Sequence, residues 1–316
     1  MAKLRISVVQ YLNTAPLVWG FAHGPLRGKY ELSFTVPSLC AEALRAGAAD
    51  VAILPSIEIQ RMEGMAVLPG MAIASKNCVR SLLVLAKGPI EQARRIALDR
   101  SSRSTQALVR ILCVEHWKIS PEFIEGGPDA EAMLREADAA LVIGDPALRI
   151  SLAIEDRARE GQFRGTGNRN ADLETRNAKL EIRNAGDVGL VVHGAETLCV
   201  YDVASEWRRL TGLPAVMAFW AARREVATAE VAADFLASRD YGVARIAEIS
   251  QEASRELGLP AEALAAYLRQ NIDFSLDEEN RRGLEHYFAR CAALGLIPRA
   301  KPLEWAPVVA SIRAAK

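Results

Sequence analysis

The sequence has few of the residues that build metal sites and disulfide frameworks. Its five cysteines and four histidines are scattered over 316 residues, and no CxxC pair occurs. An odd number of widely spaced cysteines is typical of reduced thiols rather than of disulfides. The histidines also lack the spacing of zinc ligands. We therefore expect a cytoplasmic protein with no metal ion and no other cofactor.

The sequence also lacks net charge and long apolar runs. Acidic and basic residues number 39 each, so no excess of positive charge favours nucleic acid or anionic lipid as a partner. No segment reaches the roughly 18 apolar residues that a membrane-spanning helix requires. The N-terminal MAKLRISVV begins like a secretory leader, but Gln10, Asn13 and Thr14 interrupt the apolar run. We predict neither a nucleic-acid partner nor membrane association, and the oligomeric state stays open.

The elements that are present indicate an α/β protein with two similar lobes. Half of the residues are hydrophobic and a quarter are charged, as in globular proteins, and 316 residues are enough for two domains. Strand-like runs at 5–9, 30–36 and 51–54 alternate with helical segments. The same order of elements recurs about 90 residues later, starting at Arg95. A repeated strand–helix pattern predicts two α/β units.

Two strand-like runs connect the predicted lobes, at 79–85 and 214–220. Two crossings make the first lobe discontinuous, so we predict lobe 1 at 1–84 plus 216–316 and lobe 2 at 85–215. The end of lobe 1 is expected to consist of helices. The polar, Arg/Asn-rich segment at about 156–189 is predicted to be a solvent-exposed insertion in lobe 2 that contributes nothing to a site.

Polar residues follow the predicted strands, where ligands collect in open α/β sheets. We expect them to face each other across a cleft between the lobes. They are Tyr11, Asn13, Thr14 and Ser56 on one wall, Ser102, Arg103, Ser104, Thr105, Gly144 and Asp145 on the other, and Arg80 and Ser81 beside the crossing. Hydroxyls, amides and the free N–H groups of helix starts suit a small carboxylate ligand.

Several of these residues also have a purely structural interpretation. Asn13, Thr14, Ser38 and Ser104 are equally consistent with helix caps. Ser38 would cap a helix at about 39–46, and the spacing Ser275 to Glu278 is that of a capping box. Arg residues such as Arg80 more often lie at surfaces or lobe interfaces than against ligands. From the residues alone, the prediction is a two-lobed protein that binds a small anion.

Seven motifs in order resemble the chorismate dehydratases of futalosine-dependent menaquinone biosynthesis, the MqnA branch of the MqnA/MqnD family. They cover nearly the whole chain except about 156–196. The motifs are VQYLNTAPL from Val9, LPSIE from Leu54, VRS from Val79, LD at Leu98 with SRST from Ser102, IGDPAL from Ile143, EWRRLTGLP from Glu206, and NI at Asn271.

The resemblance implies a fold similar to the type II periplasmic binding proteins, with two mixed or parallel sheets, flanking helices and a cleft between. It implies a hydro-lyase that converts chorismate to 3-[(1-carboxyvinyl)oxy]benzoate, the first step of the pathway, without a cofactor. Carried over by motif, Asn13 and Ser81 would be the main active-site residues, and 102–105 would hold a carboxylate. The family usually has Thr then Ser where this chain has Ser104 and Thr105, which keeps two hydroxyls. No matching motif supplies an obvious base, so we hypothesise that the enolpyruvyl carboxylate of the substrate takes the proton.

Two alternatives stay open. One is 1,4-dihydroxy-6-naphthoate synthase of the same pathway, which shares the fold. Its opening motif has a Ser-Pro-Cys-Pro character that is absent here, and it is expected to use a histidine base. The other is a non-catalytic solute-binding protein for a small anion, for which a leader peptide or a lipid-attachment cysteine would be expected near the start.

Overall fold

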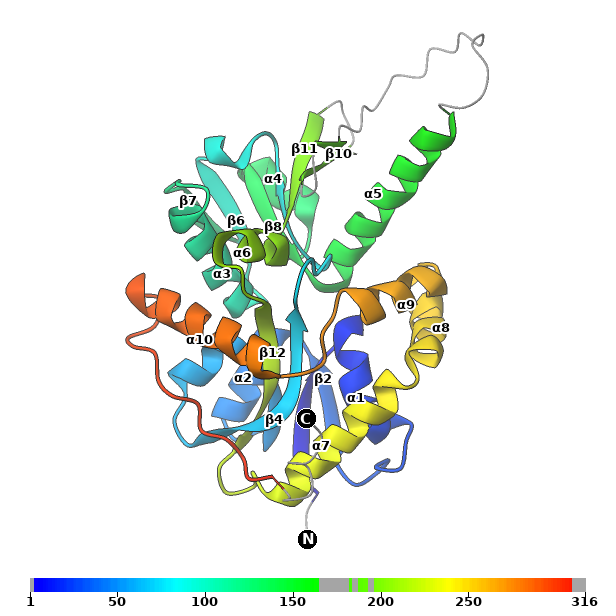
Figure 1. The fold of residues 1–316 in the computed structure, drawn as a ribbon, viewed down its shortest axis with the longest axis vertical. Coiled ribbons are helices and arrows are strands. Elements are labelled where there is room, and N and C mark those ends of the chain that lie inside the picture. Colours follow the sequence, from blue (N-terminus) through cyan, green and yellow to red (C-terminus); the bar gives the residue numbers. More distant parts are fainter. Residues whose placement is uncertain (1–2, 165–181, 184–186, 193–195, 309–316) are drawn as a thin grey trace.

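Two β-sheets organise the molecule, one in each half of the view in Figure 1. The computed structural model describes residues 3–164, 182–183, 187–192 and 196–308. Within these residues the first sheet contains, in spatial order, β2 (Glu31–Thr35), β1 (Arg5–Val9), β3 (Val51–Pro55), β12 (Ala215–Arg223) and β4 (Met65–Ser75). The second contains β7 (Glu122–Gly126), β6 (Arg95–Asp99), β8 (Ala139–Ile143), β5 (Leu82–Ala86), β11 (Glu196–Asp202), β10 (Asp187–Val192) and β9 (Ile182–Arg183). Both sheets combine parallel and antiparallel pairs, which confirms the predicted fold class.

Helices follow the strands of both sheets. Around the first sheet they are η1 (Leu12–Thr14), α1 (Ala15–Ala22), α2 (Pro37–Arg45), η2 (Ser56–Arg61) and α7 (Ala229–Val243). Around the second they are η3 (Ile90–Gln92), α3 (Arg103–Glu115), α4 (Ala130–Glu136), α5 (Gly144–Arg164) and α6 (Val203–Thr211). β1 and β6 are each followed by a polar turn and a helix, so the repeat seen in the sequence corresponds to equivalent positions in the two sheets.

The C-terminal part is helical, as predicted. α8 (Ile246–Leu257) and α9 (Ala261–Gln270) lie on one side of the middle of the molecule, and α10 (Glu278–Ala293) lies on the other (Figure 1). All three follow β12, which runs antiparallel between β3 and β4 in the first sheet. The C-terminal helices therefore reach the region where the two sheets meet.

Close packing of α7 against α1 fixes the segment that follows β1. The Ser238 hydroxyl donates to the carbonyl of Leu17 over 2.9 Å. A Cβ on Gly242 would lie 2.1 Å from the carbonyl oxygen of Pro16, so only glycine allows this approach. Pro16 is in the first turn of α1, and η1 directly precedes that helix. The contact with Gly242 therefore also fixes the position of η1.

The sheets suggest a division of the chain close to the one predicted. β5 begins at Leu82 and belongs to the second sheet, whereas the sequence predicts that lobe 1 extends to residue 84. β12 begins at Ala215 and belongs to the first sheet. We propose that each sheet is the centre of one lobe, with crossings at about 76–81 and 212–214.

Two predicted helix caps differ in the structure. Val36 precedes α2, which begins at Pro37, so Ser38 lies inside the helix instead of capping it. α10 is capped by Asp277, whose carboxylate accepts the N–H of Asn280, whereas the Ser275 hydroxyl donates to Asp273. In both cases a residue two positions from the predicted cap has the extended backbone that an N-cap position requires.

The Arg/Asn-rich segment predicted as an insertion at 156–189 is only partly described. α5 continues to Arg164, and β10 pairs antiparallel with β11, so the described ends of the segment extend the fold of the second lobe. Residues 165–181 and 184–186 lie outside the described part.

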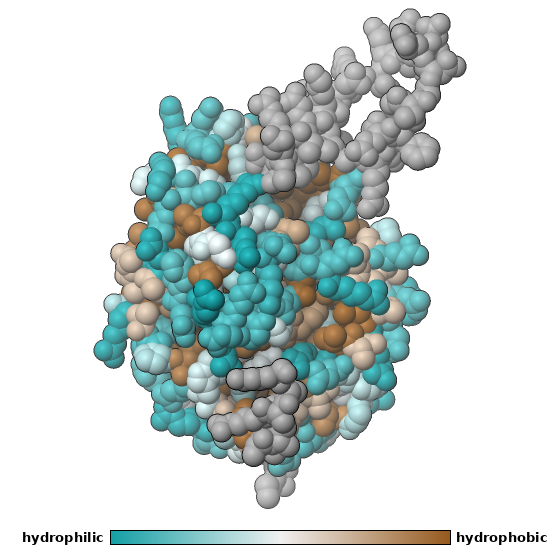
Figure 2. All heavy atoms as spheres, in the orientation of Figure 1, coloured by the Kyte–Doolittle hydropathy of each residue, from teal (hydrophilic) through white to brown (hydrophobic). Residues whose placement is uncertain are grey.

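Hydrophilic side chains cover most of the face shown in Figure 2, with hydrophobic residues in small separate patches between them. Among the described residues, no helix combines the length and the apolar composition that crossing a membrane demands.

Candidate active site

A small cavity lies between the two sheets, where strands of both lobes end. Five polar side chains line it, those of Tyr11, Asn13, Ser81, Ser102 and Thr105, and the remaining lining is apolar apart from Gly144. Among the described residues that line it, none is an acid, a lysine, an arginine or a histidine. Its volume is about 40 Å³, room for about three water molecules. Its lining includes six of the predicted site residues, which are Tyr11, Asn13, Ser81, Ser102, Thr105 and Gly144.

Asn13 and Ser81 reach this cavity from different elements. Asn13 is on η1, which follows β1, and Ser81 immediately precedes β5. The hydroxyl of Tyr267, on α9, donates to Ser81 Oγ over 2.8 Å and is also hydrogen-bonded to the Asn13 side chain. Both predicted residues therefore interact with one phenolic hydroxyl.

The turn before Ser81 is held by Asp202, which the sequence analysis did not single out. Its carboxylate accepts the N–H groups of Val79 (3.1 Å) and Arg80 (2.6 Å) and that of Ser205 in α6. Burial raises the pKa of Asp202. Arg80 has a φ of 62°, a left-handed conformation that is unusual for a residue with a side chain. These bonds stabilise that conformation and so orient Ser81.

The first turn of α3 supplies the donors on the opposite wall. Ser102 and Thr105 line the cavity, and their hydroxyls are 2.8 Å apart. The first N–H groups of a helix have no partner inside the helix, and the positive end of its dipole attracts anions. Asp99 stabilises the turn into this helix by accepting the N–H and the hydroxyl of Ser101. This wall therefore has the chemistry of a carboxylate site.

Tyr11 and Gly144 close one side of the cavity across the lobes. Gly144 has a φ of 68°, and its N–H donates to the carbonyl of Ser81 over 2.8 Å. A Cβ at Gly144 would lie 2.8 Å from ring carbons of Tyr11. Glycine at this position is therefore required both by the backbone conformation and by the contact with the aromatic ring.

Three other predicted residues lie beside the cavity without lining it. Thr14, Ser56 and Ser104 are buried. Ser56 donates to the carbonyl of Val216 over 2.8 Å, and Ser104 Oγ accepts the N–H of Ile57 over 3.0 Å. Ser104 thus joins α3 to the first lobe, whereas the neighbouring Thr105 hydroxyl faces the cavity.

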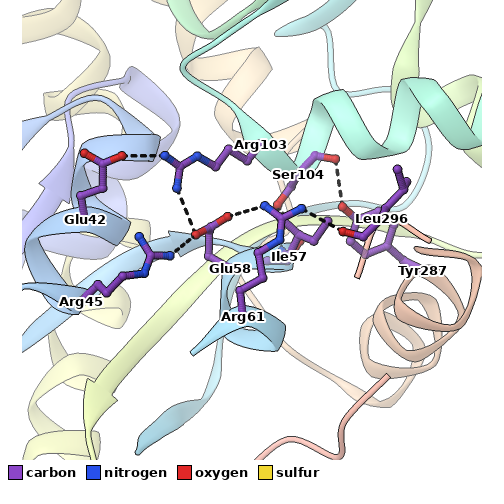
Figure 3. A network of polar contacts seen from close by, with 10 residues as sticks. Glu42, Arg45, Ile57, Glu58, Arg61, Arg103, Ser104, Tyr287 and Leu296 are labelled. Carbon is purple, nitrogen blue, oxygen red and sulfur yellow. Dashed lines mark hydrogen bonds and ion pairs between the residues drawn. The ribbon is translucent and has the colours of Figure 1, made fainter. Parts of the chain in front are cut away.

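The two predicted arginines make ion pairs outside the cavity. Arg80 pairs with Glu155 over 2.7 Å and donates to Ser151. Arg103 lies between Glu42 (2.6 Å) and Glu58 (3.1 Å), as Figure 3 shows. The structure therefore places both guanidinium groups at structural contacts, in agreement with the interface interpretation of Arg80.

Glu58 is the centre of this ion-pair network between the lobes. It is fully buried and accepts from Arg45 (2.5 Å) and Arg61 (2.8 Å) of the first lobe as well as from Arg103 of α3 (Figure 3). The network therefore holds the start of α3 against the first lobe.

Asp145 forms another contact between the lobes. Its carboxylate accepts the N–H of Leu12 over 3.1 Å, and it lines a neighbouring groove rather than the cavity. Burial raises the pKa of Asp145 to about 6, against the opposing effects of the Leu12 N–H and of Arg149, and Glu256 raises it further. The carboxyl is therefore held in an environment that disfavours its charged form.

This pKa leads to a prediction on stability. Because the pKa is higher in the folded protein, the penalty from the buried charge develops as pH rises from about 4 to about 6 and is complete above 6. Asp145→Asn keeps an oxygen for the Leu12 N–H and removes the charge. We expect the variant to be more stable than the parent by about 1–3 kcal/mol at pH 8, with the difference vanishing towards pH 4. Thermal unfolding of both proteins across this range tests it, and parallel pH profiles would contradict it.

A larger hollow of about 840 Å³ lies outside the cleft, between α7 and the segment that follows α9. It is open, and charged residues of its lining pair with each other, for example Arg239 with Asp240 (2.6 Å). We place the candidate site in the smaller cavity because polar groups from both lobes converge there. Among the described residues, no group of three or more histidines, cysteines or acids is arranged to bind a metal ion.

Comparison with known proteins identifies similar sequences along most of the chain. The model of a family described as menaquinone biosynthesis matches residues 4–161 and 167–293. A chorismate dehydratase from Thermus thermophilus is 27% identical over 296 residues, which cover 92% of this chain and 95% of that protein.

Solved structures resemble the fold at low sequence identity. A protein from Archaeoglobus fulgidus superposes with a TM-score of 0.63 at 19% identity, covering 93% of this chain and 98% of its own. The periplasmic aliphatic sulphonate binding protein of Escherichia coli has a TM-score of 0.56 at 16% identity and 95% coverage of both chains. The chain thus has the two-lobed architecture of periplasmic binding proteins.

Proposed function

The chain belongs to the menaquinone biosynthesis family, and from this premise we propose that it is a hydro-lyase that dehydrates chorismate to 3-[(1-carboxyvinyl)oxy]benzoate. The observation that carries the proposal is the convergence of Asn13, Ser81 and the start of α3 on one cavity without charged lining residues. The Thermus thermophilus relative, named chorismate dehydratase, supports the same reaction.

The reaction requires stabilisation of negative charge on the ring. The C3–H bond of chorismate is next to the C1=C2 double bond, which is conjugated with the ring carboxylate. Loss of the C3 proton therefore spreads charge onto that carboxylate, and the C4–O bond then breaks with its electron pair leaving on hydroxide. The proton and hydroxide form water, and the ring becomes aromatic. Hydrogen-bond donors aimed at the ring carboxylate stabilise this charge as it develops.

The first turn of α3 is suited to hold the ring carboxylate. Its N–H groups and the hydroxyls of Ser102 and Thr105 are donors on one wall of the cavity. Asn13 and Ser81 lie where lobe 1 meets the crossing segment. In this arrangement Asn13 orients the reacting part of the substrate, and Ser81 donates to the departing C4 oxygen.

We assign the base to the substrate. The described lining of the cavity holds no carboxylate and no imidazole, and burial raises the pKa of Tyr11, which keeps its hydroxyl protonated. The enolpyruvyl carboxylate is attached through the oxygen on C3 and so can reach the C3 proton within the molecule. Holding this group in a reactive geometry and excluding water contributes several kcal/mol to such a step.

Entry of the substrate requires the lobes to separate. Chorismate is far larger than the roughly three water molecules that the cavity admits. The contacts between Leu12 and Asp145, between Ile57 and Ser104, and between Glu58 and Arg103 join the lobes around it. Opening must break such contacts, and closure over the substrate restores them around a wider cavity.

A direct assay tests the proposed function. The purified protein, after dialysis against a chelator, is mixed with chorismate alone, and the ultraviolet spectrum and product mass are followed. A benzoate product formed by loss of one water, without any added cofactor, is the expected result. Unchanged chorismate would reject the proposal, and calorimetric binding of chorismate without conversion would favour a solute-binding protein.

The sister activity, 1,4-dihydroxy-6-naphthoate synthesis, has less support from the site. It is expected to need a histidine base, and none of the described residues that line the cavity is a histidine. Conversion of cyclic dehypoxanthinylfutalosine but not of chorismate in the same assay would assign that activity instead.

A further inference from the structure

Tyr267 lies behind the two predicted catalytic residues. It comes from α9, far along the chain, and its side chain is only 1% exposed. Its hydroxyl donates to Ser81 Oγ over 2.8 Å and is hydrogen-bonded to the Asn13 side chain. Tyr267 does not line the cavity, so any effect on the substrate passes through Ser81 and Asn13.

The directions of these bonds determine what Ser81 offers to a ligand. A phenol has one proton, and Tyr267 uses it on Ser81 Oγ. Ser81 Oγ therefore accepts a hydrogen bond from Tyr267, and the proton of the Ser81 hydroxyl is free to point to another acceptor. The carbonyl of Val79 is its one acceptor in the described structure and lies at 3.4 Å, which is long for a hydroxyl bond. A substrate oxygen in the cavity is a better acceptor.

The same bond orients Asn13. The carbonyl oxygen of its side chain faces the Thr14 hydroxyl at 3.4 Å. The Asn13 side chain lowers the pKa of Tyr267 against the effect of burial, as an amide N–H that donates to the phenolic oxygen does, and this bond uses one of the two amide protons. The second amide proton remains for a ligand. One buried phenol thus turns both side chains into donors towards the cavity.

The fold keeps Tyr267 in place relative to the crossing segment. Asn271, one helical turn further along, donates to the carbonyl of Cys78 over 3.1 Å. A β-bridge between Ala74 and Asp273 joins the segment after α9 to β4. Both contacts connect the end of α9 to the stretch of chain that leads to Ser81.

We propose that Tyr267 is a positioning residue for the dehydration, which directs the hydroxyl of Ser81 and the amide of Asn13 at the substrate. This inference rests on the proposed function. Burial raises the pKa of Tyr267, which keeps the phenol protonated and able to donate at neutral pH. Because the group acts on orientation, its removal affects the reacting complex more than the binding of substrate.

Tyr267→Phe tests this role because it removes the hydroxyl and keeps the ring. We expect kcat for chorismate dehydration to fall about 10- to 100-fold, with KM changed less than about threefold. Tyr30→Phe is the matched control, because Tyr30 is also a buried tyrosine whose hydroxyl donates to a side chain, that of Asp234, and neither residue lines the cavity. The control is expected to keep kcat, whatever its effect on thermal stability.

A double-mutant cycle with Ser81→Ala separates positioning from general structure. If Tyr267 acts through Ser81, the loss in the double variant falls well short of the product of the two single losses. Losses that multiply, or an unchanged kcat in Tyr267→Phe, would overturn the inference while leaving the proposed function intact. A parent protein that does not convert chorismate would reject the proposed function, and the inference with it.

Discussion

Replacing Asn13 with alanine is expected to lower kcat for chorismate dehydration by about 10²- to 10³-fold, because a donor that acts on the reacting part of the substrate is lost. The side chain lines the cavity on a short helix, whose N-cap position makes no side-chain hydrogen bond. We therefore expect little change in thermal stability. Initial rates across a range of chorismate concentrations measure the effect.

Two further variants make this test specific. Asn77→Ala removes an exposed asparagine of the crossing segment that does not line the cavity, and it should keep full activity. Asn13→Asp keeps the shape but places a carboxylate near the carboxylates of the substrate, so KM should rise as well. Full turnover by Asn13→Ala would show that the assignment is wrong.

The fold class and most strands could be predicted from the sequence because their signals are local. β1 and β6 are short apolar runs that end in polar turns, and β3 is one that ends at Pro55. A strand buried on both faces requires such a run. The common offset between Arg5 and Arg95 indicated two units before any contact was known. Helix caps were less certain, as Ser38 shows, because neighbouring residues compete for the same position.

The site could be predicted only in part, because side-chain direction depends on contacts across the lobes. Asn13, Ser81, Ser102 and Thr105, four of the predicted residues, line one cavity. Arg103 follows Ser102 directly, yet it turns to Glu42 and Glu58, and no local pattern encodes that choice. An arginine next to a proposed anion site is expected to bind the anion, but in the structure Arg103 pairs with the buried Glu58.

Tyr267 shows what sequence reasoning misses altogether. It lies on α9, far along the chain from Asn13. Its position in the helix is that of a core residue. The nearest signal is the Asn271 motif four positions later, which marks the segment without indicating the tyrosine. Only the tertiary contact with Ser81 reveals its connection to the site.

The central claim is that the substrate deprotonates itself in a cavity that supplies only uncharged donors. Chorismate whose enolpyruvyl carboxylate is replaced by a carboxamide tests it most directly, because the amide keeps the size of the group and removes its basicity. We predict that the analogue competes with chorismate for the site but is dehydrated at least about 10³-fold more slowly. Dehydration of the amide at a rate close to that of chorismate would show that a group of the protein is the base.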